Sequence, residues 1–551
     1  MNDFPILTLP ALLQQSVEKY ADLPAVAFVD ELPLTYTEFD TRRLAIMAFL
    51  EKLEIGKGDR VALLSANMPN WGITYFAIVS MGAIVVPVLP DFSVSEIENV
   101  LIHSEAKAVF VSDNLKAKIY DLDPKTLQHR ILINDFSLLK TKDKNVRFLE
   151  GEKPKKKYRV AEDDLAAIIY TSGTTGKSKG VMLTHKNICS NAVASRSVQE
   201  IVPGDRFLSV LPLSHTYENT IGFILPIISG ASIFYIKRPP TPAVLLPALK
   251  SVRPTLMLTV PLIIEKIYRS KVLPAFEKNW LVKTLYAIPP VSRKMNEVAG
   301  KKLMRTFGGE LKFFGIGGAK LDKTVEKFLR EAKFPYAIGY GLTETSPLLA
   351  GVNPLHTKLQ STGPPLEGVT LKIHNPGKFT GEGEIWAKGP NVMKGYYKEP
   401  ELTREVMTED GWFKTGDLGI LDDTNYLFIR GRSKNVIIGP SGENIFPEDI
   451  ESIINNFKHV AESLVIQQKG KLVAMVHFNR EEIEEKYHAM KEDIEKKYDE
   501  LKKELQEYVN ARVSKFSKIQ EVILQKDEFV KTATKKIKRF LYTKAHTRQE
   551  S

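Results

Sequence analysis

The chain has 551 residues, more than one domain usually holds, and its 43% hydrophobic and 26% charged residues are typical of globular proteins. Its single cysteine, Cys189, excludes an intramolecular disulfide and argues against a structural thiolate metal site. The net charge of +11 comes from 77 basic and 66 acidic residues without a nucleic-acid-binding signature, so nucleic acid is not expected as a partner.

Basic residues gather in two runs, 153–157 and 531–544. A solvated surface is the simplest interpretation, and a polyanionic ligand or an anionic membrane surface is the more specific one. The N-terminus has no basic region, which argues against a signal peptide. The longest apolar stretch, 221–236, is too short to span a bilayer and indicates buried core. We expect a soluble, cytoplasmic protein, with peripheral attachment to the inner face of the membrane as an open alternative.

Helical and strand patterns alternate from residue 36 to residue 165. Arg60–Ser65 and Gly82–Val88 have the apolar pattern of buried strands, and Trp71–Ser80 between them has the pattern of a helix. This alternation indicates α/β architecture with a largely parallel sheet. Further strands are expected at 231–236, 255–260 and 313–316.

The segment Tyr170–Gly180 reads Tyr-Thr-Ser-Gly-Thr-Thr-Gly-Lys-Ser-Lys-Gly and follows an apolar strand, Leu165–Tyr170. Glycines let the backbone approach a ligand, and successive N–H groups, hydroxyls and a lysine bind anions. The nucleotide-hydrolase phosphate loop would need glycine where Thr171 stands. The segment therefore predicts a phosphate-holding loop of another kind.

Between residues 362 and 428 the sequence pattern changes to short strands separated by glycine turns, which predicts a β-rich subdomain. A domain boundary is expected at 431–435, dividing the chain into a large domain, 1–431, and a small α+β domain, 432–551. In the small domain a helix is expected at 447–457 and strands at 463–467 and 472–478. An apolar stripe then runs from Ile483 to Tyr508 at near-heptad spacing. It predicts an amphipathic helix packed on the small domain, with a coiled-coil homodimer as the alternative.

Six more segments carry recognisable chemistry. They are Leu211–Glu218, Gly315–Ala319, Tyr340–Thr345, Gly411–Leu418, Gly431–Lys434 and Lys531–Ile537. Together with the phosphate loop, and in this order, they resemble the adenylate-forming (AMP-binding) superfamily, and within it the long-chain fatty acid–CoA ligases. The resemblance covers nearly the whole chain. It implies a large N-terminal α/β domain with a β-rich subdomain, and a small mobile C-terminal domain.

The resemblance also implies a role for each matching position. The phosphates of ATP would meet Thr171, Ser172, Gly173, Thr174, Thr175, Gly176 and Lys179. Adenine would lie against Gly317, Gly318, Ala319, Tyr340 and Gly341, while Asp417 and Arg432 would hold the ribose. Thr343 would contact the α-phosphate, Glu344 with Thr171 would hold Mg²⁺, Lys434 would be the hinge and Lys536 the catalytic lysine. His215 and Gly341 would border the acyl pocket.

Three positions depart from the family pattern. Lys535 replaces the glycine before the catalytic lysine, and Asn435 and Ile438 replace polar residues beside the hinge. Gly341 stands where ligases of short acids carry tryptophan, so the resemblance implies an open tunnel for a long acid.

The implied reaction is activation of a long-chain fatty acid by ATP to an acyl-adenylate, followed by transfer to CoA. Transfer to an acyl-carrier protein is the first alternative, because the acceptor is read by surface contacts. A luciferase-like oxygenase using the same adenylate is more remote. A binding module without activity would lack Glu344, Asp417 or Lys536, and none of these is missing.

Overall fold

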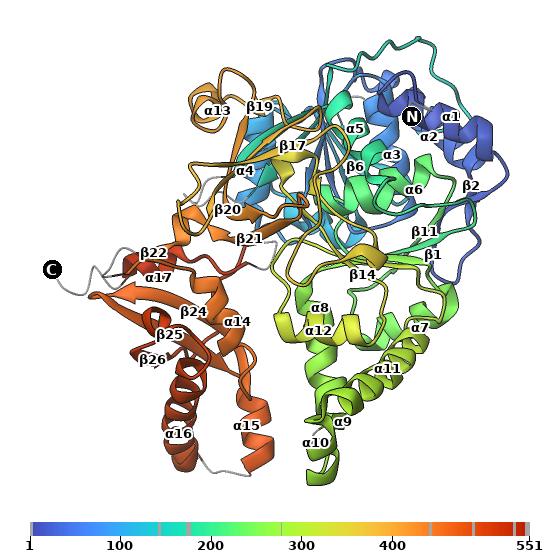
Figure 1. Ribbon diagram of the computed structural model, residues 1–551. Coiled ribbons are helices and arrows are strands. Elements are labelled where there is room, and N and C mark those ends of the chain that lie inside the picture. The colour runs from blue at the N-terminus through green and yellow to red at the C-terminus, as the bar shows by residue number, and fades with distance from the viewer. Residues whose placement is uncertain are drawn as a thin grey trace.

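The computed structural model describes residues 4–141, 145–171, 178–276, 278–439, 443–487, 491–532 and 536–545. A large α/β body holds the chain up to the orange strands of the β-rich sheet, and a smaller α+β body follows (Figure 1). The predicted fold class is thereby confirmed, while the boundary after residue 431 stays a prediction.

An eight-stranded sheet presents the phosphate loop. Its strands in spatial order are β19 (Gly395–Tyr396), β9 (Lys179–Thr184), β8 (Leu165–Thr171), β4 (Ile84–Val88), β3 (Arg60–Leu64), β5 (Ala108–Val111), β6 (His129–Leu132) and β7 (Leu138–Lys140). Strands β8 and β9 form an antiparallel pair in which Thr171 faces Lys179. The loop residues 172–177, between these two strands, lie outside the described residues.

A seven-stranded sheet forms the second layer. Its order is β14 (Tyr336–Ile338), β13 (Phe313–Ile316), β12 (Leu256–Thr259), β10 (Arg206–Ser209), β11 (Ser232–Tyr235), β1 (Pro24–Phe28) and β2 (Leu34–Thr35). All neighbours are parallel except β1 and β2. The strands expected from the sequence are present at 60–64, 84–88, 232–235, 256–259 and 313–316.

One apolar core joins both sheets to the helices between them, and it includes the fully buried Trp71, Tyr75 and Phe223. The helices of the large body are α1 (Leu9–Tyr20), α2 (Tyr36–Lys52), α3 (Pro69–Ser80), α4 (Val94–Ser104), α5 (His185–Ser195), α6 (Leu225–Ile228), α7 (Pro242–Val252), α8 (Pro261–Ile267), α9 (Leu273–Phe276), α10 (Trp280–Tyr286), α11 (Pro289–Thr306), α12 (Lys323–Glu331) and α13 (Pro400–Val406). Cys189 lies buried in α5, as expected, and burial raises the pKa of its thiol. Among the described residues, no helix is long and apolar enough to cross a membrane.

The apolar stretch 221–236 is buried core, as expected, but it contains an unusual element. Residues Glu218–Ile224 form a π-helix, η2, which leads into α6 and strand β11. Phe223 on η2 packs against Gly72 of α3, where a Cβ would lie 2.5 Å from the ring. The two helices therefore meet closely at this point.

The segment 362–428 forms the expected β-rich subdomain. Its antiparallel sheet has the order β17 (Thr370–His374), β18 (Gly383–Lys388), β20 (Phe413–Leu421) and β21 (Leu427–Arg432). A short hairpin, β15 (Tyr340–Gly341) with β16 (Leu348–Ala350), precedes it and flanks the short 3₁₀ helix η4 (Thr343–Thr345).

The small body has its own sheet and its own core. Its elements are η6 (Ser433–Asn435), β22 (Ile437–Ile438), β23 (Asn444–Ile445), α14 (Pro447–Ile454), β24 (Val460–Gln468), β25 (Lys471–Phe478), α15 (Arg480–Tyr487), α16 (Lys491–Asn510), β26 (Glu521–Leu524) and α17 (Phe540–Ala545). Ile483, Leu501 and Leu505 of the predicted stripe are fully buried in this core. Packing of the stripe on the small domain is therefore confirmed for these residues, but two helices, α15 and α16, carry it instead of the one helix predicted (Figure 1). Met490 lies outside the described residues, and the homodimer stays a prediction.

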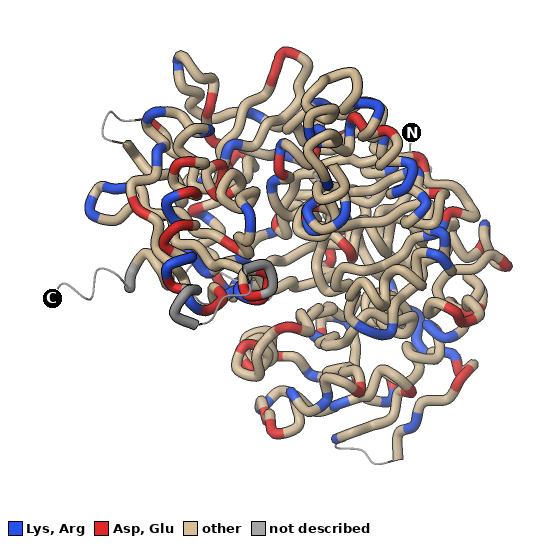
Figure 2. Tube along the Cα trace, turned by 90° about the horizontal axis from the view of Figure 1, so that it is seen from below, with Lys and Arg blue, Asp and Glu red and all other residues tan. Residues whose placement is uncertain are grey.

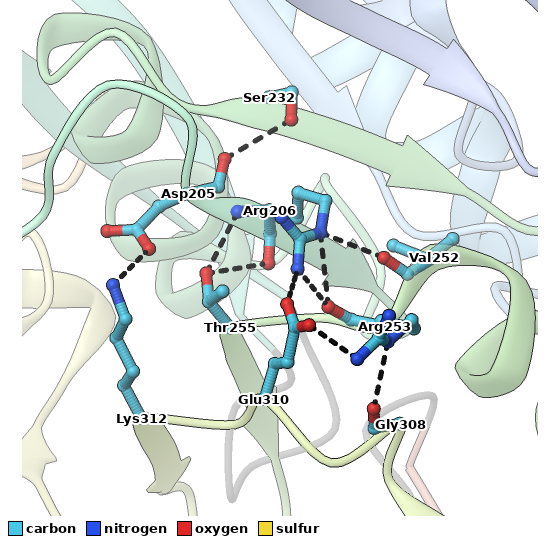
Figure 3. A network of polar contacts seen from close by, with 9 residues as sticks. All are labelled: Asp205, Arg206, Ser232, Val252, Arg253, Thr255, Gly308, Glu310 and Lys312. Atoms are coloured by element: carbon cyan, nitrogen blue, oxygen red, sulfur yellow. Dashed lines mark hydrogen bonds and ion pairs between the residues drawn. The ribbon is translucent and has the colours of Figure 1, made fainter.

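A polar network ties together the amino-terminal ends of the strands in the seven-stranded sheet (Figure 3). The buried Asp205 accepts from Lys312 at 3.0 Å, and the backbone N–H of Arg206 donates to Thr255 at 2.9 Å. Glu310 pairs with Arg206 and with Arg253. These contacts lie at the edge of the sheet where the strands begin. The predicted functional segments follow the opposite edge, where the strands end. Elsewhere, charges of both signs are mixed over much of the surface seen from below (Figure 2).

Candidate active site

The predicted site segments follow the carboxyl ends of strands in the seven-stranded sheet. Residues 210–217 follow β10, Gly317–Ala319 follow β13, and Gly339–Thr345 follow β14. Ligands of α/β proteins bind at this edge because loops from several strands converge there. The sequence motifs are thus brought together by topology rather than by nearness in the chain.

Asp417 lies at the centre of a buried polar cluster. The hydroxyl of Tyr340 donates to one carboxylate oxygen at 2.7 Å, and Nε of Arg432 forms an ion pair with the other at 2.8 Å. Strands β20 and β21 place Asp417 and Arg432 opposite one another in register. Burial raises the pKa of Asp417, and the Arg432 charge and the Tyr340 hydrogen bond oppose that rise. The three residues expected around the nucleoside therefore form one connected unit.

Glu344 is held in the short helix η4. The hydroxyl of Tyr396 donates to Oε1 of Glu344 at 2.9 Å, and the ring of Tyr396 lies 5.3 Å from the amine of Lys179. Strand β19 brings Tyr396 beside the phosphate hairpin, because it pairs with β9. No sequence motif pointed to Tyr396, which joins the Glu344 segment to the phosphate hairpin.

Of the predicted phosphate-binding residues, Thr171 and Lys179 are described and face each other at the base of the hairpin. Ser172, Gly173, Thr174, Thr175 and Gly176 lie outside the described residues. Their contacts with phosphate remain a prediction from the sequence.

Lys536 of the small body lies at the cluster built by the large body. Burial and the charge of Arg432 lower the pKa of its amine, while Asp417 and Glu344 act in the opposite direction. Its side chain is nevertheless exposed to solvent, so protein surrounds the amine without sealing it from water. Lys535 lies outside the described residues.

The backbone around Lys536 is tied to the small body by two ion pairs. Lys531 pairs with Glu462 at 2.6 Å, and Arg539 pairs with the buried Glu451. Glu451 also accepts from the backbone N–H of Val465 at 2.7 Å. These anchors hold both ends of the segment that carries Lys536. No sequence motif pointed to Glu451 or Glu462, which are distant from Lys536 in the chain.

His215 faces the same site from the loop after β10. Burial, and then the Lys536 charge, lower its pKa to about 4, so the imidazole is neutral near pH 7. Its Nδ1 accepts from the backbone N–H of Tyr217 at 3.3 Å. A neutral imidazole can lie beside the Lys536 amine without charge repulsion, whereas a protonated one would repel it.

An apolar cavity extends from Tyr217 between the strand ends. Its free volume is about 40 Å³, well below the roughly 300–1,000 Å³ of small-molecule sites. Its lining includes Leu258, Gly315, Ala337 and Gly339. The ring of Tyr217 lies so close to Gly317 that a Cβ there would approach it to 3.1 Å. Tyr217 therefore separates the predicted adenine turn from the cavity, a role that the sequence did not reveal.

Gly341 has a surrounding that differs from the expectation. A Cβ at this position would lie 1.9 Å from the carbonyl oxygen of Pro347 in the neighbouring strand segment. Neither Gly341 nor His215 is among the described residues that line the apolar cavity. Close backbone approach is thus a sufficient physical reason for glycine at 341, and its place in the acyl pocket stays a prediction.

The two bodies are held together by polar contacts of helix α14. Asp322 accepts from Ser452 at 3.1 Å and from Asn456 at 2.5 Å. Lys320 pairs with Asp449 at 2.5 Å. We call this group of contacts the α14 latch; it fixes the orientation in which Lys536 faces Asp417.

The proposed hinge residue Lys434 lies exposed in η6, directly after strand β21. Beside it, Nδ2 of Asn435 donates to Glu448 at 2.7 Å, while Ile438 is exposed. Lys434 thus stands where the chain passes from one body to the other, and its role as hinge remains a prediction.

Residues 13–397 match the family model described as AMP-binding enzyme. The chain belongs to this family. Members are adenylate-forming enzymes, and the cluster of Tyr340, Asp417, Glu344 and Lys536 combines the motifs that led to this expectation. The chain is an adenylate-forming ligase, as the resemblance implied.

Two curated relatives bear on the substrate. The chain is 30% identical over 501 residues to "Long-chain-fatty-acid--CoA ligase heimdall" of Drosophila melanogaster, covering 82% of this chain and 73% of the relative. It is 29% identical over 576 residues to "Long-chain-fatty-acid--[acyl-carrier-protein] ligase AEE15, chloroplastic" of Arabidopsis thaliana, covering 86% and 77%. The two names differ in the acceptor.

Among solved structures, the O-succinylbenzoate coenzyme A synthetase of Bacillus subtilis, in complex with ATP and a magnesium ion, has the same fold. The TM-score is 0.76 at 23% identity, covering 96% of this chain and 98% of that one. The two-body arrangement is therefore that of a known adenylate-forming enzyme fold.

Proposed function

We propose that the protein activates a long-chain fatty acid with ATP and transfers it to CoA, releasing AMP and pyrophosphate. The observation that carries the proposal is that the Lys536 amine of the small body lies where the charges of Asp417 and Glu344 of the large body act to raise its pKa, against the effect of burial. A cation facing a nucleoside-binding carboxylate and a metal-binding carboxylate suits a reaction in which two anions must approach. The names of the relatives support the same reaction class.

In the first step a carboxylate oxygen of the fatty acid attacks the α-phosphorus of ATP, and the bond to pyrophosphate breaks. Lys536 would stabilise the charge that gathers between the carboxylate and the α-phosphate, and Thr343 would contact the same phosphate. Asp417, oriented by Tyr340 and Arg432, would accept both ribose hydroxyls. The thiol sulfur of CoA then attacks the carbonyl carbon, AMP leaves, and the thiol proton passes to solvent.

Glu344 fits a magnesium ion, because a single half-buried carboxylate oriented by Tyr396 leaves room for the waters and phosphates that Mg²⁺ usually retains. Glu344 and Thr171 would hold the ion, which neutralises phosphate charge when bound. The described residues contain no cluster of three or more metal-ligating side chains, so the phosphates themselves would complete the coordination.

The apolar cavity beside Tyr217 is the proposed place for the alkyl chain. Its lining is almost wholly apolar and includes Tyr217, whose backbone N–H donates to His215, where the carboxylate would lie. Long-chain acids suit this lining because each buried methylene contributes about 0.8 kcal/mol to binding.

A panel of acids tests this function. Pyrophosphate exchange with acids from acetate to long fatty acids should be fastest with long ones, and mass analysis should find the CoA thioester. Ala337→Phe, which fills the cavity, should lower the rate with long acids while sparing short ones. Exchange restricted to short or aromatic acids would overturn the substrate, and a product formed only with acyl-carrier protein would establish the alternative acceptor.

A further inference from the structure

The helical hairpin α10–α11 carries an unusual surface. Four large apolar side chains around α10 are exposed: Trp280 (77%), Leu281 (52%), Leu285 (40%) and Ile288 (43%). No residue of α10 is buried. A tryptophan this exposed is uncommon, and its grouping with leucine and isoleucine indicates an interaction surface rather than scattered apolar residues.

The same hairpin is strongly basic. Residues 278–306 contain seven lysines and arginines and one acid, Glu297. All seven basic side chains are exposed: Lys278, Lys283, Arg293, Lys294, Lys301, Lys302 and Arg305. On α11, Lys294, Val298, Lys301 and Arg305 follow one another at intervals of four, three and four residues, so they share one face. We call these apolar and basic residues together the α10–α11 surface.

The opposite side of the hairpin is fixed to the large body. Gly300 packs against the backbone of Ala332, and the hydroxyl of Tyr286 donates to Asn296, which in turn donates to Glu331 at 2.7 Å. Leu303 on the same side is buried. Because this inner side is used for packing, the exposed surface is presented outward on a fixed base, and α10 lies at the far end of the hairpin (Figure 1).

The C-terminal basic run is less available than its sequence indicates, whereas Lys153, Lys155, Lys156 and Lys157 of the other run are exposed. In the C-terminal run, Lys531 pairs with Glu462 and Glu528, Arg539 pairs with Glu451, and Lys536 faces the site. On the α10–α11 surface, by contrast, Lys294 alone has an ion-pair partner within the described part of the chain. Its basic charge is therefore mostly uncompensated, although no run of consecutive lysines marks it in the sequence.

We propose that the α10–α11 surface docks the protein on an anionic lipid bilayer. Basic side chains are attracted to acidic headgroups, and tryptophan with leucine and isoleucine enters the boundary between headgroups and acyl chains. An acidic protein partner would satisfy the charges but not explain why Trp280 and Leu281 protrude at the end of the hairpin. The docking is independent of the reaction proposed above, because it uses none of the site residues.

Flotation of the full-length protein with vesicles tests the proposal. The protein should float with vesicles of phosphatidylcholine plus phosphatidylglycerol, and not with phosphatidylcholine alone. Binding should weaken as salt rises from about 0.1 M to about 1 M, which shortens the Debye length from about 10 Å to about 3 Å. Trp280 should also show a blue-shifted emission on binding, which Trp280→Phe removes.

Two variants address the two halves of the surface. Lys301→Glu with Lys302→Glu and Arg305→Glu should lower vesicle affinity at least about tenfold, and so should Trp280→Ser with Leu281→Ser. The matched control, Lys153→Glu with Lys155→Glu and Lys157→Glu, reverses the same number of exposed lysines elsewhere and should change affinity much less. Pyrophosphate exchange and thermal unfolding should be unchanged in all three, which separates lost docking from lost folding.

The proposal is overturned if the unmodified protein does not float with anionic vesicles. Equal loss in the control and in the α10–α11 variants would also overturn it, because docking would then depend on net charge alone. Binding to an acidic polymer such as heparin, without binding to vesicles, would assign the surface to a polyanion instead.

Discussion

Lys536 carries a positive charge from one body into a site built by the other. Its amine meets Asp417 and Glu344 only because the segment 531–539 is anchored at both ends. A flexible lysine loses much entropy when it is held in one place, so an anchored backbone lowers the cost of placing it. At the residue scale, the proposed adenylation step depends on where the chain holds the amine of Lys536.

Lys536→Ala should lower adenylation at least about 10²-fold, the usual scale for losing one electrostatic contact in a transition state. Thioester formation from supplied acyl-adenylate and CoA should continue near the normal rate, because the lysine acts while pyrophosphate leaves. Pyrophosphate exchange measures the first step and thioester assay the second. Lys526→Ala, at an exposed position of the same body, is the matched control and should change neither. A larger effect from Lys535→Ala would place the catalytic lysine one residue earlier.

Gly341→Ala separates two explanations of one glycine. If close backbone contact with Pro347 requires glycine, the added methyl must displace the backbone, and stability should fall by about 1–3 kcal/mol. Gly341→Trp should then be no more selective for short acids than Gly341→Ala. Thermal unfolding and the ratio of long-acid to acetate exchange measure the two effects. If Gly341→Ala is as stable as the unmodified protein and Gly341→Trp prefers short acids, Gly341 lines the acyl pocket as first predicted.

At the scale of elements, the π-helix η2 has a buried acid at its start. Glu218 accepts from Ser209 at 2.5 Å, and its second oxygen has no partner among the described residues. Gly222 makes room for the carboxyl group, because a Cβ there would lie 2.7 Å from it. Ser209 is also bound by Asn67, which holds the loop leading to His215. The acid thus lies within the structure that supports the His215 loop.

Glu218→Gln should change how stability depends on pH. Burial raises the pKa of Glu218 to about 8, so the folded protein keeps a proton that the unfolded chain releases above its ordinary pKa of 4.5. The stability that comes from this proton is complete below pH 4.5 and is lost as the pH rises toward 8. Glutamine cannot ionise, so the variant should gain stability relative to the unmodified protein between pH 5 and pH 8. Urea unfolding at both pH values measures the difference, and a difference independent of pH would show that Glu218 titrates normally.

The sequence predicted those elements whose signal is local. Buried strands such as Arg60–Leu64, and the turn after Phe313–Ile316, follow from apolar runs and glycines. The π-helix at Glu218–Ile224 could not be predicted, because its backbone depends on the close contact of Phe223 with Gly72. In the same way the motifs located Glu344 and Asp417, but not Tyr396, which reaches the site through strand pairing, and they gave no role to Tyr217, although it lies in the segment Leu211–Glu218.

At the scale of the whole molecule, the α14 latch selects one orientation of the small body. Asp322 caps helix α12 through the N–H groups of Thr324 and Val325, and the same side chain binds Ser452 and Asn456. Because the contacts are few and polar, water can replace them when the bodies separate. This suits an enzyme that performs two reactions in one site by turning a domain about a hinge.

Ser452→Ala with Asn456→Ala removes the hydrogen bonds of the latch and leaves the Lys320–Asp449 pair and the cap of α12 intact. Adenylation should fall about 10²-fold, since three hydrogen bonds of about 1 kcal/mol each are lost, the two to Asp322 and the one that Arg269 donates to Asn456. Thioester formation from supplied acyl-adenylate should be unchanged or faster. Rates of the two half-reactions, measured separately, test this; an equal fall in both would mean that the latch supports folding rather than orientation. Ser514→Ala, at an exposed position of the same body, is the control.

The apolar core of the small body contains no residue of the large body among the described residues. Every described residue of the core around Ile450, Val476 and Leu505 follows residue 436, and the cores of the large body end before it. Turning the small body about the predicted hinge, Lys434, would therefore expose little apolar surface, and the heat-capacity change of the motion should be close to zero. The balance between the two orientations should then shift only slightly with temperature, so the same hinge can serve over a wide thermal range.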